Sequence, residues 1–280
     1  MIKKEREAIT KQFFSLENKT VVVTGGGGIL AGEIAVAAAR FGGRIAVLDL
    51  FADAAKKTGR RITEGGGDAI SLQCNVTSEE DLEACCQEIL EHYGTIDGLV
   101  NGAGGNKAAA TTSAKLSFFD IPAGMHREVL DLNFLGTMLP CRVFGKVMAG
   151  QGEGSILNIA SIAGFRPLTK AAAYAAGKAA VINFTRWLAV YFCREYSPRI
   201  RVNALAPGFF ATSQNRYLLF DEAGGLTQRG EDILGQVPQK RFGDPGELTA
   251  ASVWLLSGSA SFVTGSVITI DGGFDAFSGV

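Results

Sequence analysis

The stretch TVVVTGGGGILAGEIAVAAAR, residues 20–40, decides how this chain folds. Its first five residues are all β-branched, which is typical of a buried strand. Four glycines at 25–28 follow, and the residues after them are mostly alanines and other helix formers. This order predicts a strand at 20–24, a tight turn, and a helix at 29–41 that ends before Gly42-Gly43.

Strands and helices continue to alternate along the rest of the chain. The strand segments are continuous apolar runs, which indicates burial on both faces of a parallel sheet. We therefore expect one domain over residues 1–280, an α/β fold with a Rossmann-type doubly wound parallel sheet of about seven strands and helices on both faces. The further strands are expected at 44–48, 69–74, 96–100, 155–160, 200–206 and 267–270, and the further helices at 52–64, 79–93, 122–149, 172–196 and 244–257.

The segment 209–243 contains no strand-like run and is long for a connection inside a compact domain. Long connections of this kind are often functional, and we interpret this one as a lid over a substrate.

Composition excludes several classes of protein. Net charge is −1, from 27 basic and 28 acidic residues, which argues against nucleic acid or a membrane surface as a partner. The N-terminus lacks an apolar signal core and no charge-free apolar run is long enough to span a membrane, so we expect a cytoplasmic protein. Five cysteines without a C-x-x-C, and only two histidines, argue against disulfides and against a metal site.

The glycine turn indicates a cofactor site. Glycines between a strand and a helix let the backbone approach a pyrophosphate, whose charge the helix N-terminus favours. Asp49 ends the second strand, where its carboxylate could accept hydrogen bonds from ribose hydroxyls and would repel the extra phosphate of NADP. No lysine or arginine occurs from 25 to 39 to receive that phosphate, so NAD is the predicted cofactor. The alternative is that Asp49 is an ordinary surface acid.

Two more strand ends are predicted to meet the cofactor. Asn75 and Val76 follow the third strand and could contact the adenine, and Asn101-Gly102-Ala103-Gly104 follows the fourth and could approach the ribose and pyrophosphate. Both lie at carboxyl ends of strands, where open α/β sheets bind ligands.

Tyr174 and Lys178 are four residues apart on a predicted helix, so both side chains leave one face. An ammonium near a phenol lowers the pKa of the phenol, which could then exchange a proton with an alcohol. Ser161 comes just after the fifth strand, and its hydroxyl could hold the reacting oxygen. A tyrosine–lysine pair at this spacing is common on surface helices, and its coincidence with Ser161, the glycine turn and the sheet pattern makes a catalytic interpretation the favoured one.

Over residues 17–275 the chain resembles the classical short-chain dehydrogenase/reductases. The shared motifs are Thr24-Gly25, Asn101-Gly-Ala-Gly104, Asn133, Ser161, Tyr174-Ala-Ala-Gly-Lys178, Pro207-Gly208 and Asp271-Gly-Gly273. The resemblance implies that Tyr174 is the acid/base, that Lys178 lowers its pKa and binds the nicotinamide ribose, that Ser161 orients the carbonyl, and that Asn133 holds a water in a proton relay. It also implies a homotetramer or homodimer, and cofactor contacts at Gly25, Gly28, Ile29, Leu30, Pro207, Gly208 and Phe210.

The chain departs from the family pattern in three respects. Ile29 and Ala31 stand where glycines are usual, so a turn shortened by one residue would set Gly28 against the pyrophosphate. Asn75 replaces the usual aspartate at the adenine, and Gly102 replaces the usual second asparagine of the fourth-strand motif.

Further stretches extend past the generic motifs: Asn101-Gly-Ala-Gly-Gly-Asn106, Asp131-Leu-Asn-Phe-Leu-Gly-Thr137, Phe165-Arg-Pro-Leu-Thr-Lys170, Ala206-Pro-Gly-Phe-Phe210, Gln214-Asn-Arg216 and Phe277-Ser-Gly-Val280. In these the chain resembles the mannonate oxidoreductase (fructuronate reductase) branch of the family, which implies interconversion of D-mannonate and D-fructuronate with NAD. A sugar acid needs a cation for its carboxylate, and Arg166 and Lys170 could supply it, with Asn106 and Gln214 as polar neighbours. Two alternatives remain: a reductase of another polyol or keto acid, such as a gluconate 5-dehydrogenase, and a non-catalytic NAD-binding regulator. Both cations could also be plain surface residues.

Overall fold

A computed structural model describes residues 13–212 and 216–279. Its strands form one fully parallel sheet in the order β3-β2-β1-β4-β5-β6-β7, which confirms the predicted fold class. The order reverses between β1 and β4, and a crevice is expected there at the carboxyl ends of the strands. The strands are β1 (Thr20–Thr24), β2 (Arg44–Asp49), β3 (Asp68–Gln73), β4 (Gly98–Asn101), β5 (Gly154–Ile159), β6 (Ile200–Pro207) and β7 (Val267–Ile270).

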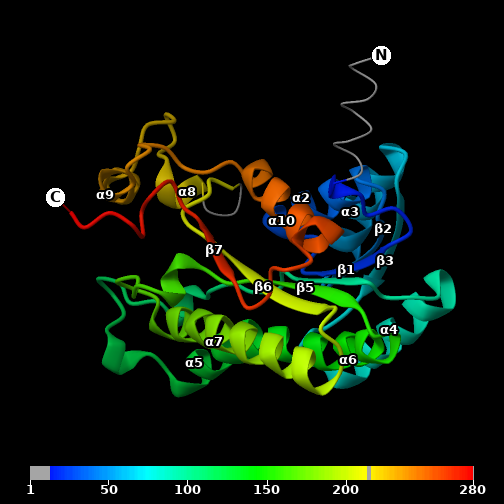
Figure 1. Ribbon diagram of the computed structural model, residues 1–280. Helices are drawn as coiled ribbons and strands as arrows, with labels where there is room; N and C mark the ends of the chain where they lie inside the picture. The colour runs from blue at the N-terminus through cyan, green and yellow to red at the C-terminus, as the bar shows by residue number, and fades with distance from the viewer. Residues whose placement is uncertain (1–12, 213–215, 280) are drawn as a thin grey trace, which may run out of the picture.

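Helices cover both faces of the sheet (Figure 1). Side chains of β1 alternate between two cores, with Val21 and Val23 in one and Val22 in the other, as the period of two in a strand requires. One face carries α2 (Ile29–Arg40), α3 (Ala52–Glu64) and α10 (Thr249–Leu256); the other carries α4 (Glu79–Tyr93), α5 (Ala123–Leu130), α6 (Gly136–Gln151) and α7 (Ala172–Glu195).

The helix predicted as continuous over 122–149 is interrupted. A π-helical turn at Asp131–Leu135 separates α5 from α6. Pro140 lies inside α6, where a missing N–H leaves an earlier carbonyl without its usual helical partner. Such π turns are frequent at functional sites, and this one contains Asn133.

The segment 209–243 closes on itself at its base. Gly243 donates a backbone hydrogen bond to Phe209 (2.9 Å), and Ala211 donates one to Gly243 (3.1 Å). The described residues between them contain the short helices α8 (Arg216–Leu219) and α9 (Gln228–Gln236) and no strand. The helix expected at 244–257 begins as a 3₁₀ turn, Pro245–Leu248, before α10. Closure of this segment over a substrate stays a prediction.

Within residues 13–212 and 216–279, no helix combines the length and apolar character needed to cross a bilayer. The same residues contain no group of three or more histidine, cysteine or acidic side chains that could hold a metal ion.

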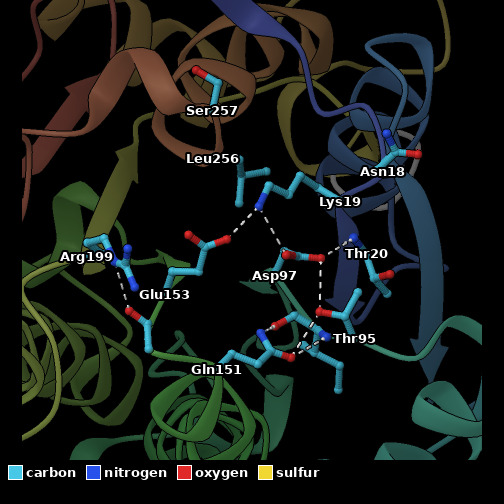
Figure 2. Close-up of polar contacts among 12 residues, drawn as sticks. Asn18, Lys19, Thr20, Thr95, Asp97, Gln151, Glu153, Arg199, Leu256 and Ser257 are labelled. Atoms are coloured by element: carbon cyan, nitrogen blue, oxygen red, sulfur yellow. Dashed lines mark hydrogen bonds and ion pairs between the residues drawn. The ribbon is translucent and has the colours of Figure 1, made fainter.

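A polar cluster joins the amino ends of three adjacent strands (Figure 2). Lys19, just before β1, donates to Asp97 before β4 (3.2 Å) and to Glu153 before β5 (3.0 Å). Asp97 also accepts the backbone N–H of Thr20 at 2.9 Å. The hydrogen bond from Lys19 holds the pKa of Glu153 below its usual value. This cluster therefore stabilises the sheet at the amino ends of these strands, away from their carboxyl ends.

Replacing Asp97 should weaken the fold without touching catalysis. The Asp97 side chain is 13% exposed, so water screens its contacts little. Asp97→Asn removes the negative charge that pairs with the Lys19 ammonium and accepts the Thr20 N–H. We expect the free energy of unfolding to fall by about 1–3 kcal/mol in urea titrations. Glu153→Gln is the matched control: this side chain is 48% exposed, so its loss should cost less than about 1 kcal/mol. Equal losses for both variants would contradict this account.

Candidate active site

A cleft of about 440 Å³ opens at the carboxyl ends of the strands, at the predicted crevice. It is lined by Gly25, Gly27, Gly28, Ile29, Leu30, Ala31, Asp49, Leu50, Phe51, Ala54, Cys74, Val76, Gly102, Ala103, Gly104, Gly105, Leu132, Ile159, Ala160, Ser161, Tyr174, Lys178, Pro207 and Gly208.

Two strand-end loops form the floor of the cleft by close backbone approach. Gly25 has a φ of +61°, and a Cβ there would lie 2.7 Å from the Ala103 Cα. A Cβ on Gly102 would lie 2.5 Å from the Ala31 Cβ. Only glycine fits at both positions. At 102 the Ala31 side chain, which stands where the family usually has glycine, takes the space that the usual asparagine would need.

Asp49 shapes the opposite end of the cleft from the catalytic side chains. Its Oδ2 accepts the Gly27 N–H (3.0 Å) and its Oδ1 accepts the Phe51 N–H (3.0 Å). Each carboxylate oxygen has a second lone pair for a further donor, such as a ribose hydroxyl. Among the described lining residues, Asp49 and Lys178 are the charged ones, so no cation lines the cleft near Asp49.

Ser161, Tyr174 and Lys178 converge on the cleft from β5 and α7. Ser161 lies two residues after the end of β5 as the N-cap of the 3₁₀ turn Ile162–Gly164, and its Oγ accepts the Ala163 N–H at 3.1 Å. It lines the cleft together with Tyr174. Tyr174 and Lys178 come from the first two turns of α7, and the Lys178 Nζ lies 5.8 Å from the centre of the Tyr174 ring. The Nζ also donates to the Ile159 carbonyl at 2.7 Å. The structure thus brings together the three side chains that the sequence proposed for catalysis.

The pKa of Tyr174 differs from the sequence-based expectation. Burial raises it, and the hydrogen bond from Ser161 offsets only part of the rise. The Lys178 ammonium nearby is hydrogen-bonded to the Ile159 carbonyl and is itself desolvated. The phenol is therefore protonated at neutral pH in this state, which suits a proton donor to a carbonyl.

Burial lowers the pKa of Lys178 to about 8. Since the unfolded value is near 10.5, the buried charge costs stability in full below pH 8, and this cost disappears as pH rises toward 10.5. Lys178→Met should therefore raise the free energy of unfolding at pH 7 by about 1–3 kcal/mol, with a smaller gain at pH 10. Urea unfolding at both values checks this, and a less stable variant at pH 7 would refute it.

Asn133 is fully buried in the π turn and faces the glycine loop after β4. Its Nδ2 donates to the carbonyls of Gly105 (2.7 Å) and Val129 (2.8 Å), and its Oδ1 accepts the Gly105 N–H (3.2 Å). A Cβ on Gly104 would lie 2.9 Å from this Oδ1 and 3.1 Å from the Lys178 Nζ. Asn133 thus lies beside Lys178, while its predicted water-holding role stays a prediction.

Three predicted cofactor residues are turned away from the cleft. The Asn75 side chain accepts hydrogen bonds from its neighbour Thr77, as asparagines in turns do, although Cys74 and Val76 line the cleft. Asn101 is buried and donates to Asn158 (2.8 Å), so it joins strand ends. Phe210 lines a separate cavity beside Gly243.

The predicted substrate residues are not brought to the cleft either. Arg166 forms an ion pair with Asp275 (2.8 Å), and Lys170 lines a separate apolar groove over the start of α7. Asn106 is exposed and donates to Thr111 (2.9 Å). Gln214 lies outside the described residues. No cation from the loop after Ser161 thus reaches the cleft in this structure.

Sequence reasoning missed several lining residues. Phe51 and Ala54 come from the start of α3, and Leu132 comes from the π turn. Gly27 packs so closely on α3 that a Cβ would lie 2.5 Å from the Ala54 Cβ. The four-glycine run was the one available signal of this close packing. It did not reveal which helix would approach each glycine.

Known proteins resemble the chain over nearly its whole length. The family profile described as enoyl-(acyl carrier protein) reductase matches residues 28–275. An uncharacterised oxidoreductase of Haemophilus influenzae is 43% identical over 277 residues, which is 95% of this chain and 96% of the relative.

Two solved structures extend the comparison. One, from Haemophilus influenzae, is provisionally named a D-mannonate oxidoreductase and contains bound NAD. It matches with a TM-score of 0.90 at 42% identity, and the match covers 95% of this chain and 98% of the other chain. Another, from Beutenbergia cavernae, is provisionally named an NAD(P)-dependent gluconate 5-dehydrogenase and contains NADP at low occupancy. It matches with a TM-score of 0.82 at 32% identity, and the match covers 94% of this chain and 99% of the other chain. The chain therefore belongs to the classical short-chain dehydrogenase/reductase family of NAD(P)-dependent oxidoreductases.

Proposed function

We propose that this enzyme transfers a hydride between NAD and a sugar acid, with D-mannonate and D-fructuronate as the substrate pair. The observation that carries the proposal is the convergence of Ser161, Tyr174 and Lys178 on one end of a cleft whose other end holds Asp49. Hydride transfer between a nicotinamide and a carbonyl carbon is the chemistry that the bound cofactor supplies.

The residues present fit a dinucleotide. Gly25 and Gly102 bring the backbone of two loops to the cleft beside the N-terminus of α2, where the charge of a pyrophosphate would be favoured. Asp49 has acceptor capacity for ribose hydroxyls, and the described residues that line the cleft include no cation beside it for a 2′-phosphate. This arrangement favours NAD over NADP.

The catalytic side chains would divide the work on the substrate oxygen. In the reduction, the Tyr174 hydroxyl gives its proton to the carbonyl oxygen as the carbon accepts a hydride, and the Ser161 hydroxyl holds that oxygen by a hydrogen bond. Lys178, beside Tyr174, supplies the positive charge that stabilises the resulting phenolate.

The substrate class is supported by the comparison with the Haemophilus influenzae structure rather than by a carboxylate-binding cation in the cleft. Initial rates should be measured with NADH or NADPH against D-fructuronate and 5-ketogluconate. We expect the highest kcat/KM for D-fructuronate with NADH. No turnover of D-fructuronate would refute the substrate, and a preference for 5-ketogluconate would establish the second candidate, to which the Beutenbergia cavernae structure points.

A homotetramer through α6 and α7 is also part of the proposal. Trp187 and Val190 on α7 are 56% and 58% exposed in the single chain, and Trp187 stacks on Tyr191 at 5.0 Å. An apolar face of this kind supports self-association. Light scattering should give the mass of four chains, and a monomer mass would contradict it.

A further inference from the structure

The C-terminal turn after β7, residues 271–277, is braced from within. The Asp271 carboxylate accepts the N–H groups of Gly273 (2.8 Å) and Asp275 (2.6 Å), and Phe277 donates to the Gly273 carbonyl (3.1 Å). Gly272 and Gly273 have φ values of +64° and +91°, which side chains rarely adopt. The turn is thus a compact unit at the edge of the sheet, next to β7 (Figure 1).

One side of this turn contacts the segment Pro207–Phe209 at the end of β6, which we call the Pro207–Phe209 wall of the cleft. Gly208, which lines the cleft, donates to the Ile270 carbonyl at 2.9 Å, and a Cβ on Gly208 would lie 2.6 Å from the Asp271 Cβ. The Phe274 ring packs edge-on against Phe209, with ring centres 5.2 Å apart. Movement of the turn would therefore move this wall.

The other side of the turn is held by Arg166. Its Nε donates to the Asp275 carboxylate (2.8 Å), its Nη2 donates to the Asp275 carbonyl, and its Nη1 donates to the Phe277 carbonyl (3.4 Å). The Arg166 N–H in turn donates to Ile162 at 3.0 Å, in the 3₁₀ turn that Ser161 caps. A planar guanidinium with several donors can hold three acceptors of one turn together.

We propose that this clasp, defined as Arg166 with its acceptors on Asp275 and Phe277, sets the distance between the Ser161 turn and the Pro207–Phe209 wall. Arg166 and Asp275 are then positioning residues for the carbonyl substrate. The substrate used to test them rests on the proposed function; the clasp itself does not. An acidic side chain cannot bind a substrate carboxylate, so dependence of KM on Asp275 distinguishes the clasp from direct substrate binding by Arg166.

Hydrogen exchange tests the clasp without any substrate. The NADH complexes of the wild type, Arg166→Gln, Asp275→Asn and the charge swap Arg166→Asp/Asp275→Arg are compared. Arg142→Gln is the control, because its ion pair with Glu79 links α6 to α4 away from the cleft. We expect faster exchange at 207–211 and 271–277 in both single variants, partial recovery in the swap, and none of these changes in the control. Unchanged exchange in Arg166→Gln would overturn the clasp.

Steady-state kinetics test the positioning role. Both single variants should raise KM for D-fructuronate about three- to tenfold, with kcat within about twofold and the Kd of NADH unchanged. The swap should recover part of the KM. A higher KM in Arg166→Gln alone would show that Arg166 contacts the substrate itself. If no form turns over D-fructuronate, the proposed function fails, while the exchange result still decides whether the clasp exists.

Discussion

Tyr174→Phe is expected to lower kcat for carbonyl reduction by about 10³-fold, because the variant cannot give a proton to the forming alkoxide. Tyr174, whose hydroxyl is lost in the variant, lines the cleft together with Ser161. The ring that remains still fills its place between α7 and the cleft, so the Kd of NADH should stay within about twofold. Single-turnover rates and NADH fluorescence titration measure the two quantities separately.

Tyr93→Phe is the matched control. Tyr93 is also a mostly buried tyrosine, but its hydroxyl donates to Asp68 (3.0 Å) at the amino end of β3. Its loss should leave kcat unchanged. If Tyr174→Phe kept more than about a tenth of wild-type kcat, proton donation by Tyr174 would be wrong.

Gly25→Ala is expected to weaken NADH binding by more than about tenfold and to lower the free energy of unfolding by about 2–4 kcal/mol. The φ of +61° is strained for alanine, and the new Cβ would lie 2.7 Å from backbone atoms of Ala103. The two loops would have to separate, and the backbone that faces the pyrophosphate would move with them. Calorimetric titration with NADH and urea unfolding measure both effects.

Gly66→Ala separates backbone strain from close approach. Gly66 has a φ of +81°, and nothing lies within 4 Å of a Cβ placed there. This variant should lose about 1 kcal/mol of stability and keep wild-type affinity for NADH. Equal loss of NADH affinity in both variants would contradict the close-approach explanation.

Local chemistry made much of the fold predictable. The strands Thr20–Thr24 and Val267–Ile270 begin and end where the apolar β-branched runs do. Tyr174 and Lys178 share a helix face by spacing alone, and the parallel sheet brings the end of β5 to the same cleft. Near-neighbour patterns therefore located the predicted catalytic residues.

Contacts between distant residues account for the rest. Arg166 has the position of a substrate-binding cation, but its partner Asp275 is 109 residues away and no local pattern connects them. The π turn at Asp131–Leu135 packs against α7, which is distant in sequence, so no local pattern predicted it. Asn75 is different, because asparagine side chains in turns often accept the backbone N–H two residues on, as Asn75 does from Thr77, and this tendency is local.

A crystal structure of the ternary complex with NAD and D-mannonate tests the central claim most directly. We predict that the reacting hydroxyl of the substrate lies within hydrogen-bond distance of both Tyr174 and Ser161, that Asp49 accepts from the adenosine ribose, and that Arg166 remains on Asp275. A substrate hydroxyl bound away from Tyr174 and Ser161 would contradict the proposed chemistry.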